Sequence, residues 1–520
     1  MKKILAIITV TALIFGFTAC KDNKKVQVDG QYVITWLGNP NMPMEKDTEA
    51  QKFIEEKFDV KIEPISITTS YIEKIGGMIA SNDTPDIMFI NEPEHWQPLA
   101  EQLALAEIPV ERIQKYAPNY YKWVTEMVPD IFAISNIDGV NWAIPKISGG
   151  EYNTSVIWRK DWLDKLGITK VPDTLSEFEE AFIKIRNEDP DGNGQKDTYG
   201  LTGLGGHPVR QFDMIFGAYG IMPAQWVVED GKVINGTIHE KSRTALELLK
   251  KWYEMELIDP EFITDNVSTH GKKFESGRLA IVTDAAASWI PSMPVGKMKL
   301  DDWKAREADA EFVIGSIPQG PDGKRGDWLW GPRGNFVVFG EQLEKDPEKL
   351  NYILKMLDTM FSDEETALRL TWGRKGIEYD YNDPEIGESS GLKYLPPYDN
   401  DIAARAKAGV GQFGFYNQLT PLVGFSTTEI SRKYSPKEYL EINDRLSNWS
   451  NCQDALLRPG LPSGSEYVGN LEKVKTTAYS AFITGTRDLA EWDAFVQEWE
   501  SQGGRQLTLE AQEFYNSNFR

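Results

Sequence analysis

Hydrophobic and polar positions near the start of the chain switch repeatedly between strand-like and helix-like periods. The pattern predicts a strand over residues 32–37, a helix over 50–58, a strand over 60–65, a helix over 72–79 and a strand over 87–90. Strands that alternate with helices predict a doubly wound α/β lobe with a largely parallel sheet. Because ligands bind beyond the carboxyl ends of such strands, the loop after Trp36 and residues 91–93 are expected to face a ligand.

The rest of the chain continues the same interleaving. A second α/β region is expected to start near residues 148–150, whose glycines let a crossing strand swivel. Thr174 and Glu177 have the spacing of a capping box, so a helix is predicted to begin between them. Further strand and helix patterns cover residues 335–339 and 346–370, and the C-terminal part is mainly helical. The pattern therefore predicts two lobes joined by several crossings, one from residues 31–147 with about 332–395, the other from 148–331 with about 396–520.

The N-terminus has the pattern of an export signal. Two lysines precede the apolar stretch of residues 4–19, which is shorter than the roughly 20 residues a bilayer-spanning helix needs. The stretch ends in Ala19-Cys20, and a polar segment over residues 21–30 follows as a tether. The Ala-Cys junction resembles the lipobox of bacterial lipoproteins, in which the cysteine is acylated, although Phe17 replaces the usual Leu. We expect an extracytoplasmic protein anchored to the cell membrane, periplasmic or surface-exposed; the alternative is an ordinary cleaved signal with an incidental Cys20.

Composition excludes several classes of function. The 520 residues are 41% hydrophobic, so the chain has enough apolar area for a large core. With 79 acidic against 56 basic residues, the net charge of -23 repels nucleic acid. Cys20 and Cys452 are the two cysteines, too few for a disulfide framework, a four-Cys zinc site or a CxxC redox pair. Cys452 is expected to be a small, partly buried apolar residue.

A run of acidic and amide residues has the spacing of a calcium loop. Side-chain oxygens come at the first, third, fifth and ninth positions, the seventh supplies a carbonyl, and Gly194 makes the sharp turn. The predicted ligands are Asp189, Asp191, Asn193, Gln195 and Asp197. The twelfth position is Gly200, so the bidentate Glu of an EF-hand is missing. We expect a structural Ca²⁺ here; the alternative is a solvated turn.

Signatures of common enzymes are missing from the sequence. It contains no HExxH, no Gly-x-Ser-x-Gly and no P-loop. The glycine-rich segment 203–208 ends in proline and does not open a βαβ unit, so a dinucleotide site is not expected. Paired carboxylates of a glycosidase stay open as an alternative, because 79 acidic residues offer many pairs.

Four segments resemble the extracellular solute-binding proteins of ABC importers, family 1. They are residues 81–87 (Ser-Asn-Asp-Thr-Pro-Asp-Ile), 138–145 (Asp-Gly-Val-Asn-Trp-Ala-Ile-Pro), 158–163 (Trp-Arg-Lys-Asp-Trp-Leu) and 274–281 (Phe-Glu-Ser-Gly-Arg-Leu-Ala-Ile). They occur in the family's order, and Asn82 stands where the family has Gly. The resemblance implies two α/β lobes of the type 2 periplasmic-binding fold around a ligand cleft.

The length resembles that of the long oligosaccharide binders, including the alginate-binding proteins. The local similarity lies in the calcium loop, although Thr198 stands where the alginate binders have an acidic residue. The resemblance implies a monomeric, lipid-anchored protein that captures an oligosaccharide, does no covalent chemistry on it and delivers it to the ABC permease subunits. The alternative is a secreted, lipid-anchored glycoside hydrolase with paired carboxylates.

Sugar ligands need aromatic faces to stack on and fixed polar partners for their hydroxyls. The candidate ligand-binding residues are Trp36, Asn39, Tyr152, Arg210, Trp289, Trp330, Arg333, Phe413 and Tyr416. Trp289 is expected to be a platform on a cleft-facing loop, with a core tryptophan as the alternative. Whether the sugar contains uronates is left open; Arg210 and Arg333 matter most if it does, because a guanidinium binds a carboxylate through two hydrogen bonds.

Overall fold

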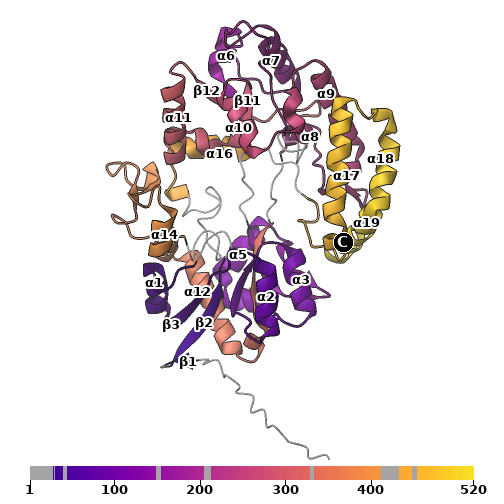
Figure 1. Cartoon of the computed structure of the whole chain (residues 1–520). Helices are drawn as coiled ribbons and strands as arrows, with labels where there is room; N and C mark the ends of the chain where they lie inside the picture. Colours follow the sequence, from indigo (N-terminus) through magenta and orange to yellow (C-terminus); the bar gives the residue numbers. More distant parts are fainter. Residues whose placement is uncertain are drawn as a thin grey trace, which may run out of the picture.

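The computed structural model describes residues 27–28, 30–38, 44–147, 154–203, 212–327, 333–411, 432–447 and 454–520. Figure 1 shows two lobes, with the N-terminal α/β lobe at the bottom of the view and the second lobe at the top. The C-terminal helices, in yellow, run down the right side of the upper lobe to the level of α3. The two-lobed α/β architecture agrees with the expectation from the sequence. None of the described helices has the length and apolar character needed to cross a bilayer.

The first lobe is built on a mixed sheet. Its strands are β1 (Gln27–Val28), β2 (Gln31–Leu37), β3 (Val60–Ile65), β4 (Ile87–Ile90), β7 (Ala143–Ile147) and β13 (Arg333–Phe339). The order is β1-β2-β4-β13-β7, with β3 beside β2. Strand β2 is parallel to β3 and β4, whereas β13 is antiparallel to β4 and β7. The predicted largely parallel sheet is therefore wrong for the half that contains β13, because the chain enters that strand from the other lobe.

Helices cover the first sheet as the periodicity predicts. They are α1 (Glu49–Phe58), α2 (Tyr71–Ala80), α3 (Pro93–Glu101), α4 (Val110–Tyr116), α5 (Pro118–Met127), α12 (Pro347–Ser362) and α13 (Glu364–Thr371). The long helical pattern after residue 346 divides at Asp363, whose side chain accepts from the Thr366 N–H and caps α13. One hydrophobic core joins residues between Ile34 and Ile144 with residues between Phe336 and Leu370.

A buried ion pair explains the segment around Pro85. The Asp86 carboxylate accepts hydrogen bonds from the backbone N–H and the hydroxyl of Thr35, at 2.8 and 2.9 Å, and lies 3.0 Å from the Lys349 ammonium. Both charged side chains are buried, and Gln342 donates to the second carboxylate oxygen at 3.1 Å. Asp86 therefore holds β2, β4 and α12 together in the core of the first lobe.

The second lobe contains an antiparallel sheet in the order β11-β8-β12, formed by β8 (Thr154–Arg159), β11 (Ile281–Ala285) and β12 (Phe312–Gly315). A hairpin of β9 (Trp226–Glu229) and β10 (Lys232–Asn235) adds to it. Its helices include α6 (Lys160–Lys165), α7 (Leu175–Asn187), α8 (Asp213–Ala218), α9 (Glu240–Glu254), α10 (Val267–Glu275), α11 (Pro294–Arg306), α16 (Lys437–Ser447), α17 (Gly464–Thr484), α18 (Trp492–Trp499) and α19 (Arg505–Asn518). A second core joins residues 156–317 with residues 456–511. The residue ranges given above for the two lobes stay a prediction.

The predicted capping box is confirmed. The Thr174 hydroxyl accepts from the Glu177 N–H at 3.2 Å, and the Glu177 carboxylate accepts from the Thr174 N–H at 3.0 Å, so α7 begins as its sequence indicates.

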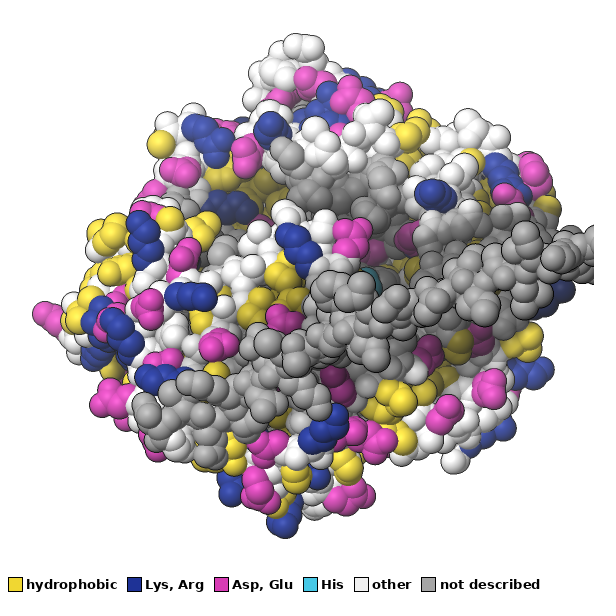
Figure 2. Space-filling view, turned by 60° about the horizontal axis from the view of Figure 1, so that its bottom comes forward, with side chains coloured by type: hydrophobic (Ala, Val, Ile, Leu, Met, Phe, Trp, Pro, Cys, Tyr) yellow, Lys and Arg dark blue, Asp and Glu magenta, His cyan; other side chains and the backbone are white. Residues whose placement is uncertain are grey.

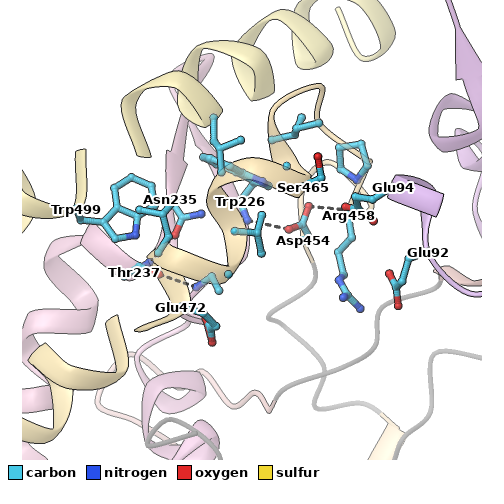
Figure 3. A pocket seen from close by; sticks show the side chains of 18 residues that line it. Glu92, Glu94, Trp226, Asn235, Thr237, Asp454, Arg458, Ser465, Glu472 and Trp499 are labelled. Carbon is cyan, nitrogen blue, oxygen red and sulfur yellow. Dashed lines mark hydrogen bonds between the residues drawn. The ribbon is translucent and has the colours of Figure 1, made fainter. Parts of the chain in front are cut away.

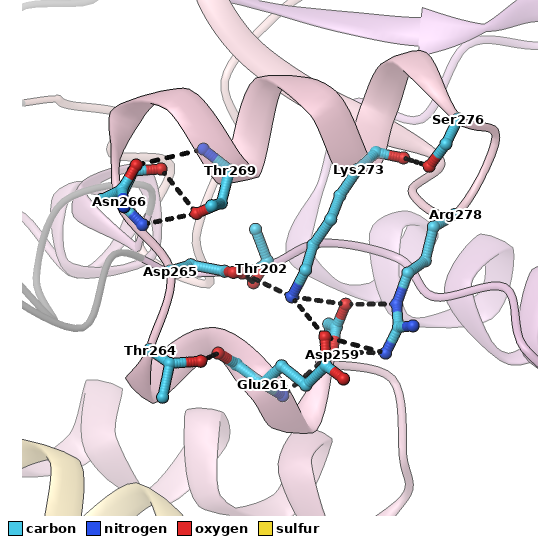
Figure 4. A network of polar contacts seen from close by, with 10 residues as sticks. All are labelled: Thr202, Asp259, Glu261, Thr264, Asp265, Asn266, Thr269, Lys273, Ser276 and Arg278. Atoms are coloured by element: carbon cyan, nitrogen blue, oxygen red, sulfur yellow. Dashed lines mark hydrogen bonds and ion pairs between the residues drawn. The ribbon is translucent and has the colours of Figure 1, made fainter.

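A buried charged network fixes the segment that leads into β11 (Figure 4). Asp259 is fully buried and accepts two hydrogen bonds from Arg278, at 2.6 and 3.0 Å, while Lys273 lies 3.1 Å away. Lys273 also donates to Asp265 at 2.7 Å, and Asp265 accepts from the Thr202 hydroxyl. The network holds α10 and the following turn against the strand segment around Thr202.

A small third cluster flanks the lobes. It contains β14 (Tyr379–Tyr381) and β15 (Leu392–Tyr394), packed around Leu368 and Tyr379, and α14 (Ile402–Ala408) lies beside them. Arg405 of α14 lies over the Tyr394 ring at 5.0 Å.

Candidate functional site

A cavity of 420 Å³ lies between the two lobes (Figure 3). The first lobe contributes Glu92 and Glu94, from the end of the β4–α3 loop and the start of α3. The second lobe contributes the hairpin β9–β10 and the segment from Asp454 to Glu472. Residues 91–93 were expected to face a ligand from their place after β4, and Glu92 lines this cavity.

Asp454 organises the second-lobe wall. Its buried carboxylate accepts from the backbone N–H groups of Trp226, Leu456 and Arg458, at 2.8, 2.9 and 3.2 Å. Burial raises the pKa of the Asp454 carboxyl. These bonds fix the hairpin to the segment that carries Arg458, so both line the same cavity.

A glycine permits a close approach of the two lobes beside this cavity. The Gly460 carbonyl accepts from the Gln97 amide of α3 at 3.2 Å. A Cβ at Gly460 would lie 2.4 Å from Gln97 Oε1 and 2.6 Å from Pro93 Cβ, so a side chain there would push the lobes apart. Phe514 of α19 packs against the cores of both lobes at the same side of the molecule.

Two larger cavities are also present among the described residues, and one of them adjoins the first. One of 780 Å³ shares Pro459 and Leu461 with the first cavity and reaches α19 and the turn around Asp138. The other, of 910 Å³, lies between the start of α11, the β14–β15 connection and the start of α16.

Two of the predicted aromatic platforms are core residues. Trp36 is fully buried in the first core. Trp289 is 4% exposed, its indole N–H donates to Asp284 at 2.9 Å, and the Lys299 ammonium lies 4.2 Å from its ring centre. The Phe312 ring packs 5.0 Å from it. The expectation of open stacking faces is therefore wrong for both tryptophans in this structure, because side chains of neighbouring elements cover their rings.

Of the other candidate ligand-binding residues, the described part of the chain contains only Arg333. Arg333 begins β13 and pairs with Ile147. The candidates outside the described residues are Cys20, Asn39, Tyr152, Arg210, Trp330, Phe413 and Tyr416, together with Cys452. Sequence reasoning missed Trp226, Asn235, Arg458 and Glu472, which line the first cavity. The one available signal was the proline- and glycine-rich run 459–464, which indicates a loop.

A buried lysine lies at the end of β7, where the chain leaves the first lobe. Lys146 is 5% exposed, and its ammonium lies 5.8 Å from the centre of the Phe89 ring. Burial lowers its pKa to about 7, so this group carries only part of a positive charge at neutral pH.

The predicted calcium loop brings its carboxylates together. Asn193 Nδ2 donates to Asp191 at 2.8 Å and to Asp197 at 3.2 Å. The Asp189 carboxylate accepts from the backbone N–H groups of Gly192 and Gly194, at 3.1 and 2.9 Å. The Asn193 amide nitrogen thus lies between two of the acidic side chains. Within the described ranges no group of three or more His, Cys, Asp or Glu side chains is arranged to hold a metal ion.

The loop carboxylates differ in proton affinity. Partial burial and the adjacent Asp189 raise the pKa of Asp191. The hydrogen bonds from Asp191 and from the Gly194 N–H lower the pKa of Asp189. The donor set of carboxylate, amide and carbonyl oxygens is the kind that calcium prefers.

Comparisons with known proteins give the family. Residues 43–366 match the model of bacterial extracellular solute-binding proteins. Lipoprotein LipO of Bacillus subtilis is 24% identical over 408 residues, 76% of each chain. The polygalacturonan/rhamnogalacturonan-binding protein YtcQ of the same species is 24% identical over 69% of this chain and 67% of its own.

Among solved structures, the ABC-transporter substrate-binding protein FusA of Streptococcus pneumoniae in complex with kestose has a TM-score of 0.62 at 18% identity, over 93% of this chain and 99% of that one. This likeness shows the two-lobed fold. Because the family model spans more than half of the residues, the chain belongs to the bacterial extracellular solute-binding proteins.

Proposed function

We propose that this protein is the substrate-binding component of an ABC importer, and that it captures an oligosaccharide between its lobes and delivers it to the permease unchanged. The observation that carries the proposal is the cavity between the lobes, lined by carboxylate, amide and guanidinium groups and bordered by Trp226 and Trp499, which are 7% and 3% exposed. Sugars need apolar faces and fixed polar partners in this combination. The sugar ligands in the names of YtcQ and of the FusA complex support an oligosaccharide as the class.

A glycan panel tests this function. A binding oligosaccharide at 100 times its dissociation constant is expected to stabilise the protein by about 2.7 kcal/mol, which raises the melting temperature. Mass spectrometry of the same mixture should recover the sugar at its original length. Shorter products that accumulate at catalytic protein concentrations would support the glycoside hydrolase alternative instead.

We also propose that Ca²⁺ binds the loop of residues 189–197. Asp189, Asp191, Asn193 and Asp197 would hold the ion by side-chain oxygens and Gln195 by its carbonyl, and the ion would neutralise the mutual repulsion of the carboxylates. The convergence of Asp191 and Asp197 on one nitrogen supports this proposal.

Removal of calcium should lower the melting temperature. An ion that binds only the folded state stabilises it by an amount that grows with the logarithm of the free ion concentration above the dissociation constant. Chelation is therefore expected to shift the curve downward and added CaCl₂ to restore it. Asp191→Ala should abolish the response to both treatments. Glu180→Ala, at an exposed position of α7, is the control with the same change of charge and should respond like the unchanged protein. If neither chelator nor Asp191→Ala shifts the melting temperature, the loop is a turn that binds no Ca²⁺.

We further propose that acylation of Cys20 anchors the protein to the cell membrane, on the basis of the Ala19-Cys20 junction after a charged and apolar start. A Cys20→Ser variant cannot be acylated at that position and is expected in the soluble fraction, whereas the unchanged protein should sediment with membranes. Equal sedimentation of both would contradict the anchor.

A further inference from the structure

Acidic side chains dominate the linings of the cavities beside α3. In the first cavity, the charged lining residues are Glu92, Glu94, Asp454, Arg458 and Glu472. In the adjoining cavity, they are Glu101, Asp130, Asp138, Glu510 and Glu513, with no lysine or arginine among the described lining residues. By contrast, acidic and basic side chains are mixed over the face of the molecule that Figure 2 shows. The negative lining is thus concentrated where the lobes meet.

Basic side chains neutralise only some of these acidic side chains. Lys475, 6% exposed at its side chain, forms an ion pair with Glu472. No ion pair within the described part of the chain involves Glu94, which lines the first cavity and lies beside Gly464. The Asp454 carboxylate is already taken up by backbone N–H groups, so its position is rigid. A carboxylate ligand placed here would face negative charge in a partly desolvated space, where Coulomb repulsion is stronger than in water.

The same lining suits uncharged sugar units. Asn235 is 6% exposed and lines the first cavity; its side-chain oxygen accepts from the Thr237 N–H at 3.0 Å. No described residue accepts a hydrogen bond from its amide nitrogen, which is left to donate to a ligand oxygen. Carboxylates accept hydrogen bonds from sugar hydroxyls, and charge-assisted bonds of this kind are the stronger ones. Trp226 and Trp499 border this cavity from the second core, each less than one tenth exposed (Figure 3).

We propose that the oligosaccharide bound between the lobes is neutral, and that the acidic lining beside α3 discriminates against uronates. The proposal rests on the proposed function and names the charge class of its ligand. It separates this protein from its relative YtcQ, whose name specifies polygalacturonan. The third cavity has a mixed lining that includes Lys297, Lys393 and Lys437 beside acidic residues, so the discrimination belongs to the α3 side.

Matched neutral and uronate trisaccharides test the charge class. Pairs such as galactotriose and trigalacturonate, or mannotriose and trimannuronate, differ at C6 by a hydroxymethyl or a carboxylate group. Calorimetric titration at 50 mM NaCl is expected to show at least tenfold tighter binding of the neutral member in every pair that binds. At 500 mM NaCl the gap should narrow, because salt screens repulsion but leaves neutral binding nearly unchanged. Tighter binding of the uronate overturns this inference and leaves the oligosaccharide function standing; absence of binding across a broad glycan panel overturns both.

Glu94→Gln tests the residue-level origin of the effect. Removal of this charge is expected to raise affinity for the uronate at least threefold without raising affinity for the neutral partner. Glu111→Gln, at an exposed position of α4 outside all three cavities, changes the net charge equally and should leave both affinities as they were. Equal effects of the two variants would assign the discrimination to the overall charge of -23 and contradict a role for the lining.

Discussion

Replacement of Asp86 by alanine is expected to lower the free energy of unfolding by about 3–5 kcal/mol. The change leaves the Lys349 ammonium in the core without its carboxylate and removes the acceptor for the Thr35 N–H and hydroxyl. Urea denaturation followed by circular dichroism measures the loss. The effect is large because a buried charge without its partner has lost hydration as well as its Coulomb attraction.

The double variant Asp86→Ala/Lys349→Met is the internal control. It removes both charges, so it is expected to be more stable than Asp86→Ala alone. If the double variant loses at least the sum of the two single changes, the ion pair is not the source of the effect. Glu63→Ala removes a carboxylate at an exposed position of the neighbouring β3, and it should change the midpoint of urea denaturation little.

Trp289→Ala should destabilise the second lobe by about 3–5 kcal/mol, as truncation of a buried aromatic residue does. The indole packs against Phe274, Trp303 and Phe312, and its N–H is bonded to Asp284. Thermal denaturation measures the effect, and Trp289→Phe, which keeps most of the volume, should lose clearly less. Leu103→Ala serves as a control, since Leu103 is 72% exposed.

The alternative outcome for Trp289 is informative. An unchanged melting temperature in Trp289→Ala, together with a loss of sugar binding, would show that the ring is a platform after all and that Lys299 lies over it only in the ligand-free protein. The structure favours the core role, because Lys299 and three aromatic rings surround the indole.

Local structure followed closely from the sequence. The expected helix over 50–58 is α1, the expected strand over 60–65 is β3, and the capping box of α7 forms as its residues indicate. Periodicity and capping depend on neighbours within a few positions along the chain, so one segment carries the whole signal. The sequence did not predict the direction of every strand. Strand β13 belongs to the first sheet but enters it from the second lobe, and it runs antiparallel to β4.

The sequence predicted only part of the candidate site. The position after β4 indicated residues 91–93, and Glu92 does line the first cavity. The opposite wall comes from Trp226, Asn235 and Arg458, which are more than 130 positions away along the chain and have no common motif. Only the fold brings them to Glu92 and Glu94.

By itself, the sequence determined the two-lobed class and most local elements, because each depends on residue types at short, regular spacings. Tertiary structure decided which tryptophans are exposed and which charges surround the ligand space. Trp36 lies near the end of β2 and Trp289 follows β11, where binding residues often occur, yet packing by other elements buries both. The acidic character of the cavities likewise arises from carboxylates that are scattered along the chain and gather only when α3 meets the 454–472 segment, since burial and field are properties of neighbours in space.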